Sequence, residues 1–230
     1  MGDHAPGRRG REAGKSLTPL YPPEPAPDAD AIEAGRRLFA HEIRFAAAAA
    51  DESGLPPDTL PEVAFLGRSN VGKSSLVNAV TGRTALARVS HTPGRTRLIL
   101  FFEMPGLMLA DLPGYGFAAA PKHEIARWSR LVPLYVKGRA NLKRALLLID
   151  ARHGFMRADR DFMTMLDGAA VSYQIVLTKC DKVADLAPRL AAMAAELAGH
   201  TAAHPQLHLT SAHKGFGIAE LRATIAALAA

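Results

Sequence analysis

The feature that most constrains the fold is a glycine-rich stretch between an apolar run and an amphipathic segment. It reads G-R-S-N-V-G-K-S, and its members are Gly67, Arg68, Ser69, Asn70, Val71, Gly72, Lys73 and Ser74. In the pattern G-x-x-x-x-G-K-[ST], glycines let backbone N–H groups surround phosphates, and the N-terminus of the next helix adds partial positive charge. We therefore expect a strand, a loop and a helix that bind nucleotide phosphates. Lys73 should reach the β and γ phosphates, and Ser74 should hold Mg²⁺. A chance glycine turn is the alternative.

Apolar runs alternate with amphipathic segments along the rest of the chain. Runs at 63–66, 98–102, 107–110, 145–149, 175–177 and 207–209 predict six strands. Helical spacing follows residue 76 and recurs within 125–135, 186–197 and 218–228, and Pro133 should kink the second of these helices. This alternation predicts an α/β fold, with a mostly parallel six-stranded sheet and helices on both faces. A hairpin turn at Pro105 and Gly106 predicts one antiparallel edge strand.

Composition divides the chain into three parts. Residues 1–27 carry six prolines and a basic cluster but few large apolar side chains, so we expect a disordered tail. Residues 28–60 should form a helix, from residue 30 to about residue 50, and a linker that Gly54, Pro56 and Pro57 break. Residues 61–230 should then form the nucleotide-binding domain.

Charge and cysteine content indicate where the chain works. Its formal net charge is +6, and its one cysteine, Cys180, excludes an internal disulfide and fits a reducing compartment. There is no apolar run of about 18 residues and no secretory signal, so we expect a cytoplasmic protein without a membrane partner. Residues 81–144 contain eleven Lys or Arg and three acidic residues. This basic segment suits the phosphates of a nucleic acid, with an ordinary solvated surface as the alternative.

Two segments at strand ends predict that the base is guanine. Thr178, Lys179, Cys180 and Asp181 follow the run at 175–177, and Thr210, Ser211 and Ala212 follow the last one. The Asp181 carboxylate can accept hydrogen bonds from guanine N1–H and its 2-amino group. Adenine has neither donor, so it would leave this carboxylate unpaired. The Lys179 stem can cover the base, and backbone N–H groups at 210–212 can meet its 6-oxo group. We assign no chemistry to Cys180.

Two further segments lie between these motifs. Asp111, Leu112, Pro113 and Gly114 end the run at 107–110. Asp111 can bind Mg²⁺ through water, and the Gly114 amide can contact the γ-phosphate. The string H-T-P-G-R-T at 91–96 offers two threonines that can complete the magnesium shell, Thr92 and Thr96, and their spacing does not choose between them.

These strings, in this order, resemble the TRAFAC class of GTPases. Within that class they resemble the bacterial EngB family (also called YihA or YsxC) of ribosome biogenesis GTP-binding proteins. The resemblance runs from about residue 36 to the C-terminus. It is carried by G-R-S-N-V-G-K-S at 67–74, T-P-G-R-T at 92–96, D-L-P-G-Y-G at 111–116, L-L-I-D-A-R-H-G at 147–154, T-K-C-D-K at 178–182 and T-S-A at 210–212.

The resemblance implies a Ras-like P-loop fold and a slow, Mg²⁺-dependent GTPase. It implies a role in assembly of the large (50S) ribosomal subunit and in normal cell division and septation. It also makes the large-subunit precursor and its ribosomal RNA the expected partner of the basic segment at 81–144. It also implies that Thr96, rather than Thr92, binds Mg²⁺ beside Ser74 and Asp111. The nucleotide contacts would then include Gly94, Arg95, Thr96, Arg97 and Leu98. We assign catalytic roles to Lys73, Thr96 and Gly114, and we expect a monomer.

Two residues bear on the rate of hydrolysis. Tyr115 occupies the position at which Ras-like GTPases have a glutamine that orients the attacking water. A phenol cannot do this, so hydrolysis by the isolated protein should be slow. Asn70 resembles the asparagine of related GTPases that bind K⁺ beside the phosphates, so K⁺ is a candidate cofactor. The alternative for Asn70 is a side chain that stabilises the loop.

Two other functions compete with that of a GTP switch. One is a nucleotide-dependent module that binds RNA or ribosomes with little hydrolysis, and the other is a GTPase that acts at the division site. A polar cluster of Asp150, Arg152 and His153 also follows a core strand. We interpret this cluster as a structural turn rather than as a catalytic group.

Overall fold

The computed structural model describes residues 26–83, 98–115 and 122–229 of the chain, with the backbone alone at 122–129. Almost the whole predicted tail, residues 1–27, lies outside this part. Four predicted site residues also lie outside the described residues: Gly94, Arg95, Thr96 and Arg97. None of the helices in the described stretches is long and apolar enough to span a membrane.

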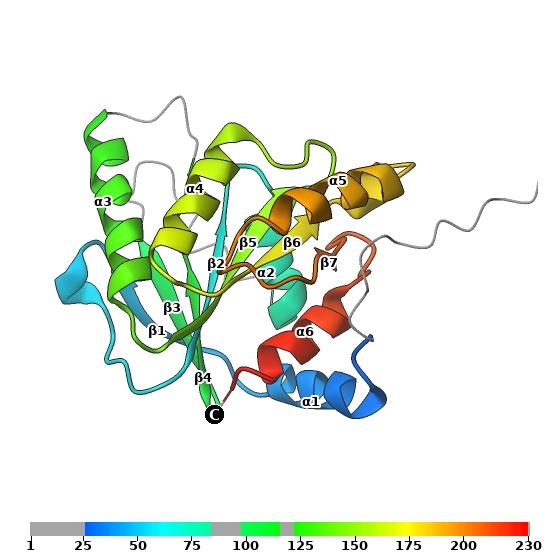
Figure 1. Ribbon diagram of the computed structural model, residues 1–230. Coiled ribbons are helices and arrows are strands. Elements are labelled where there is room, and N and C mark those ends of the chain that lie inside the picture. The colour runs from blue at the N-terminus through cyan, green and yellow to red at the C-terminus, as the bar shows by residue number, and fades with distance from the viewer. Residues whose placement is uncertain (1–25, 84–97, 116–121, 230) are drawn as a thin grey trace, which may run out of the picture.

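A single sheet forms the centre of the molecule (Figure 1). Within the described residues it has seven strands, in the order β1-β3-β4-β2-β5-β6-β7. Its central strands are almost wholly apolar and buried on both faces, as expected of parallel strands covered by helices. The predicted runs correspond to β2 (Glu62–Gly67), β3 (Ile99–Met104), β4 (Leu107–Asp111), β5 (Leu142–Asp150), β6 (Tyr173–Thr178) and β7 (His208–Leu209).

The antiparallel part of the sheet arises as predicted from a tight hairpin. β3 pairs antiparallel with β4, and Met104 pairs with Leu107 across the turn. Gly106 adopts a φ of 71°, a conformation that suits glycine at such a turn. β2, β4, β5, β6 and β7 pair in parallel.

The prediction of one helix from residue 30 to about residue 50 is wrong beyond residue 40. Helix α1 (Ala29–Ala40) begins after Asp28, whose side chain accepts a hydrogen bond from the Ala31 N–H at 2.8 Å. The chain then turns extended, and β1 (Arg44–Ala49) pairs antiparallel with β3. The sheet therefore has seven strands rather than six. Alanine favours helix in isolation, but here pairing with β3 and an edge-to-face contact of Phe45 with Phe102 outweigh that preference.

Helices cover both faces of the sheet, as predicted. α1, α2 (Lys73–Thr81) and α6 (Ile218–Ala226) pack on one face through residues such as Phe39, Leu76 and Leu221. α3 (Lys122–Gly138), α4 (Arg157–Gly168) and α5 (Ala187–Leu197) pack on the other. Pro133 lies inside α3, which continues to Gly138.

The direction of the strands places the predicted motifs together. The parallel strands β2, β4, β5, β6 and β7 all end at the same edge of the sheet. In parallel sheets, ligands bind at this carboxyl edge. Apart from Leu98, which directly precedes β3, each predicted binding segment within the described residues begins at or just after one of these strand ends.

Candidate functional site

The phosphate loop (residues 67–74) joins β2 to α2 with a tightly constrained backbone. A Cβ added to Gly67 would lie 2.9 Å from Val71 Cγ1 and 3.0 Å from Leu148 Cβ, so only glycine fits there. Gly72 has a φ of 107°, and α2 begins immediately afterwards at Lys73. The loop therefore ends on the N-terminus of a helix, where free N–H groups favour an anion.

Lys73 and Asp111 meet beside the start of α2. The Lys73 Nζ atom forms an ion pair with Asp111 Oδ1, and the two side chains are only 12% and 4% exposed. Ser74 is the next residue of the same helical turn. A hydroxyl and a carboxylate are the hard oxygen donors that Mg²⁺ prefers, so these residues fit a magnesium ion. Among the described residues no group of three or more His, Cys, Asp and Glu could hold a metal, and Thr96, the third ligand that the resemblance implies, lies outside them.

The segment after β4 lies directly against the phosphate loop. The Ser69 N–H donates to the Tyr115 carbonyl at 2.8 Å, and the Tyr115 N–H donates to the Gly67 carbonyl at 3.2 Å. A Cβ added to Gly114 would lie 3.3 Å from the Ser69 nitrogen, so a side chain at Gly114 would press on the loop. Backbone contacts thus hold Gly114 next to the loop that is expected to bind phosphates.

The Tyr115 side chain packs on α4. Its hydroxyl donates to Asp159 Oδ1 at 2.8 Å, and its ring stacks on Phe162 with centroids 4.8 Å apart. Burial, with the nearby Asp159 charge, raises the pKa of the phenol well above its ordinary value. The hydroxyl is therefore a neutral donor that is fully used inside the core.

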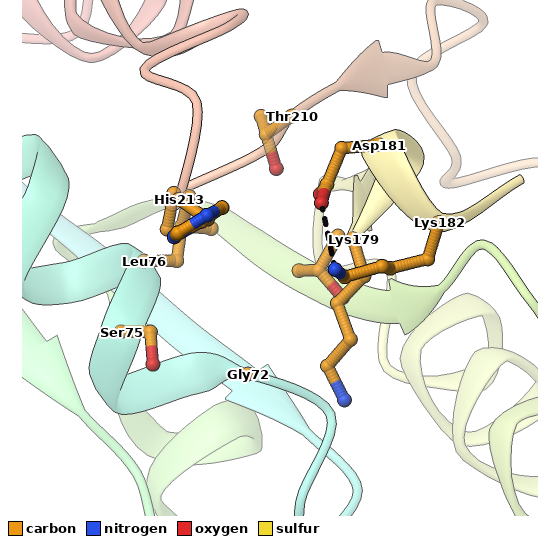
Figure 2. Close-up of a pocket in the computed structure, with 10 residues that line it drawn as sticks. Gly72, Ser75, Leu76, Lys179, Asp181, Lys182, Thr210 and His213 are labelled. Carbon is orange, nitrogen blue, oxygen red and sulfur yellow. Dashed lines mark ion pairs between the residues drawn. The ribbon is translucent and has the colours of Figure 1, made fainter.

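A cavity of about 140 Å³ opens between α2 and the loops that follow β6 and β7 (Figure 2). Asp181 and Lys179 lie on one side of it, and His213 and Leu76 lie across from them. The residues that line the cavity are Gly72, Ser75, Leu76, Thr178, Lys179, Asp181, Lys182, Thr210, Ala212 and His213. The phosphate loop and both segments predicted to select guanine therefore meet at one cavity.

Hydrogen bonds fix the Asp181 carboxylate at the cavity wall. Ser211 Oγ donates to Asp181 Oδ1 at 2.7 Å, and this bond lowers the pKa of Asp181. The Lys182 Nζ atom lies 3.6 Å from the other oxygen, Oδ2. Asp181 is therefore an ionised acceptor in a defined orientation, which suits a ligand that presents two neighbouring N–H donors.

The end of β6 is bound to the phosphate loop by side chains. Thr178 Oγ1 donates to the Val71 carbonyl at 2.6 Å, and Lys179 Nζ donates to the Asn70 carbonyl at 2.7 Å. The buried Thr210 hydroxyl in turn donates to the Leu177 carbonyl at 2.8 Å. The walls of the cavity and the phosphate loop thus form one connected unit.

Sequence reasoning missed some residues of this cavity, and two predicted residues point elsewhere. Lys182 lines the cavity and belongs to the string T-K-C-D-K, but it was assigned no role. Ser75, Leu76 and His213 line the cavity just outside the quoted motifs. Their position directly after each motif is the signal that could have identified them. Two residues of the predicted set, Leu98 and Leu112, instead pack their side chains in the core.

Among the described side chains, two arginines of the predicted basic surface make contacts inside the molecule. The side chains of Arg88, Arg95, Arg97, Lys122 and Arg127 lie outside the described part of this segment. Arg139 is only 8% exposed, because it forms an ion pair with the buried Glu62. Arg144 donates to Gln174 Oε1 at 3.1 Å and is partly buried. These two arginines stabilise the sheet and are not freely available to an anionic partner. Arg130, Lys137 and Lys143 remain exposed.

Comparisons with known proteins identify the family of this chain. A family model described as "50S ribosome-binding GTPase" matches residues 62–179. A probable GTP-binding protein EngB of Afipia carboxidovorans is 54% identical over 212 residues, which are 88% of this chain and 96% of that protein. The corresponding protein of Rhodospirillum rubrum is 54% identical over 209 residues, with coverages of 87% and 90%.

Solved structures share the fold. The crystal structure of a probable GTP-binding protein EngB matches with a TM-score of 0.57 and 26% identity, over 70% of this chain and 94% of that one. A structure of Era with MgGDPNP and a segment of 16S ribosomal RNA matches with a TM-score of 0.58 and 21% identity, over 74% of this chain and 57% of that one. This second match concerns the fold alone. The chain belongs to the EngB family of GTP-binding proteins and is a GTPase with the P-loop fold.

Proposed function

We propose that this chain is a slow, Mg²⁺-dependent GTP switch in assembly of the large (50S) ribosomal subunit, needed for normal cell division and septation. The observation that carries the proposal is the junction of the phosphate loop with the cavity that holds Asp181. EngB membership and a family model described by binding to the 50S subunit support the ribosomal role. We further propose that the protein works as a cytoplasmic monomer.

Guanine would be selected by the ionised Asp181 carboxylate. Its position beside Ser211 leaves acceptor capacity for the N1–H and 2-amino donors of guanine. Adenine would bury the carboxylate without a donor, which opposes its binding. The Lys179 stem would cover one face of the base, while backbone N–H groups at Thr210, Ser211 and Ala212 would meet the 6-oxo group.

Phosphate chemistry would take place at the other end of the site. Lys73 and the backbone of residues 67–74 would hold the phosphates, and the Gly114 amide would contact the γ-phosphate. Magnesium, bound by Ser74, Asp111 and Thr96, would neutralise charge on the β and γ oxygens. The ion pair between Lys73 and Asp111 supports this arrangement, because it brings the proposed phosphate-binding lysine next to the proposed magnesium ligand.

Slow hydrolysis follows from the orientation of Tyr115. Its hydroxyl donates to Asp159, so it does not orient water at the γ-phosphate. A cation beside Asn70 would supply positive charge at the place where an arginine finger acts in other GTPases. Asn70 has a φ of 62°, which places an unusual backbone conformation at this point of the loop. We therefore propose K⁺ as an activator. GTP hydrolysis should be faster in potassium than in sodium, and equal rates, or an unaffected Asn70→Ala variant, would exclude this role.

Cofractionation tests the ribosomal role directly. Lysates would be separated on sucrose gradients with a non-hydrolysable GTP analogue or with GDP, and the protein would be located by immunoblot. The proposal predicts sedimentation with the large subunit or its precursors in the GTP form, weakened by salt because phosphate contacts release counterions. Sedimentation with membranes, or association that depends on neither nucleotide nor salt, would contradict it.

A further inference from the structure

Asp150 ends β5 and binds two cationic side chains at once. The Lys179 Nζ atom donates to its Oδ2 at 2.9 Å. Arg152 donates from Nε to Oδ1 at 2.9 Å and from its terminal nitrogen to Oδ2 at 2.7 Å. The Asp150 side chain is only 8% exposed. These contacts connect the strand end to the loop that forms one wall of the cavity.

The Lys179 side chain is more exposed than that of Asp150, and its ammonium group has a second hydrogen-bond acceptor. Its side chain is 30% exposed and lines the cavity, and its Nζ atom also donates to the Asn70 carbonyl. A lysine stem is flexible, so its path depends on what holds the ammonium group. Asp150 and Asn70 hold it from two directions. The stem is thereby fixed between the cavity and the phosphate loop.

Charge makes Asp150 the stronger of the two acceptors. Burial alone would raise the pKa of this carboxyl, but hydrogen bonds from Arg152 and Lys179 hold it below its usual range. The group is therefore ionised at neutral pH. A charged acceptor forms a stronger hydrogen bond to an ammonium than a neutral carbonyl does.

We propose that Asp150 is a positioning residue for guanine-nucleotide binding, which acts through Lys179 on both the base cavity and the phosphate loop. This inference rests on the proposed binding of guanine in the cavity. The simpler role is that of a turn former, because Asp150 Oδ1 also accepts the Arg152 N–H at 3.0 Å. An asparagine would keep that acceptor and the shape of the turn while removing the charge.

The Asp150→Asn variant separates the two roles. Binding of fluorescent GDP to the full-length protein should weaken about tenfold, as expected for the loss of one charge-assisted hydrogen bond. Thermal stability without nucleotide should fall, because both ion pairs of Asp150 lose the carboxylate charge, so binding is compared at a temperature at which wild type and variant are both folded. Asp161→Asn removes an equal charge from an exposed site on α4 and should bind like wild type. Unchanged GDP binding by Asp150→Asn would overturn the inference and leave Asp150 as a turn former.

A double-mutant cycle tests whether Asp150 acts through Lys179. Lys179→Met keeps the apolar stem and removes the ammonium, so it should also weaken GDP binding about tenfold. The double variant should be about as weak as either single variant. A double variant about a hundredfold weaker than wild type would show independent effects and overturn the inference.

The same measurements separate this inference from the proposed function. If Asp150→Asn does not fold cooperatively, Lys179→Met alone carries the test, and unchanged GDP binding by that variant would overturn the inference. A wild-type protein that prefers GDP to ADP, together with unaffected variants, refutes only the inference. A wild-type protein without that preference refutes the guanine site, and the positioning role of Asp150 with it.

Discussion

Removing the Tyr115 hydroxyl should destabilise the protein without slowing GTP hydrolysis. Tyr115→Phe deletes the 2.8 Å hydrogen bond to Asp159 and keeps the ring that stacks on Phe162. Asp159 retains one donor, the Met156 N–H at 2.9 Å. Loss of one hydrogen bond to a buried carboxylate costs about 2 kcal/mol of unfolding free energy. For a chain of this size that lowers the Tm by roughly 4–8 °C.

Two assays and one control variant test this prediction. Thermal unfolding would give the stability change, and single-turnover hydrolysis at saturating GTP would give the chemical rate, which should stay within about twofold of wild type. Tyr135→Phe is the control, because its hydroxyl donates to the buried Glu62 at 2.8 Å on a different part of the sheet. A Tyr115→Phe variant with normal stability and much slower hydrolysis would refute the conclusion that this hydroxyl does not reach the phosphate site.

Three further variants test other parts of the account. Gly67→Ala should weaken GDP binding at least about tenfold, because the added methyl group would meet the phosphate loop and β5. In the same fluorescence titration Gly138→Ala should bind normally, because a Cβ there meets nothing within 4 Å. His213→Ala removes part of the cavity wall and should weaken GDP binding about fivefold in isothermal titration. Burial lowers the pKa of His208 to about 4, so the neutral ring is favoured in the folded state. In urea unfolding, the free energy of unfolding should therefore fall by up to about 3 kcal/mol as the pH is lowered from about 6.5 to 4. The His208→Gln variant should show a smaller fall over the same pH range.

The sequence predicted the parallel part of the fold well because those strands are buried on both faces. Runs such as residues 145–149 are continuously apolar, and a glycine-rich loop or an aspartate marks where several of them end. The two errors have local causes. β1 is alanine-rich and exposed, so its strand state depends on pairing with β3. α4 was not predicted, since charged residues interrupt the apolar spacing of Met163 and Leu166.

The site could be predicted as far as its motifs extend along the chain. Asp181 and the phosphate loop were identified because each lies in a recognisable string at a strand end. The hydrogen bonds that orient these residues could not be predicted. Lys179, Asp150 and Asn70 meet only when β5 and β6 lie side by side. The direction of the Tyr115 side chain likewise depends on α4, which pattern reasoning did not find.

Base selection by Asp181 can be measured as a preference between nucleotides. Xanthine has a 2-oxo group where guanine has its 2-amino group, so an asparagine amide at position 181 could donate to it. The dissociation constants of GDP and XDP should be measured for wild type and for Asp181→Asn. We predict that wild type prefers GDP by at least about 100-fold and that the variant prefers XDP. A variant that still prefers GDP as strongly as wild type would contradict the account.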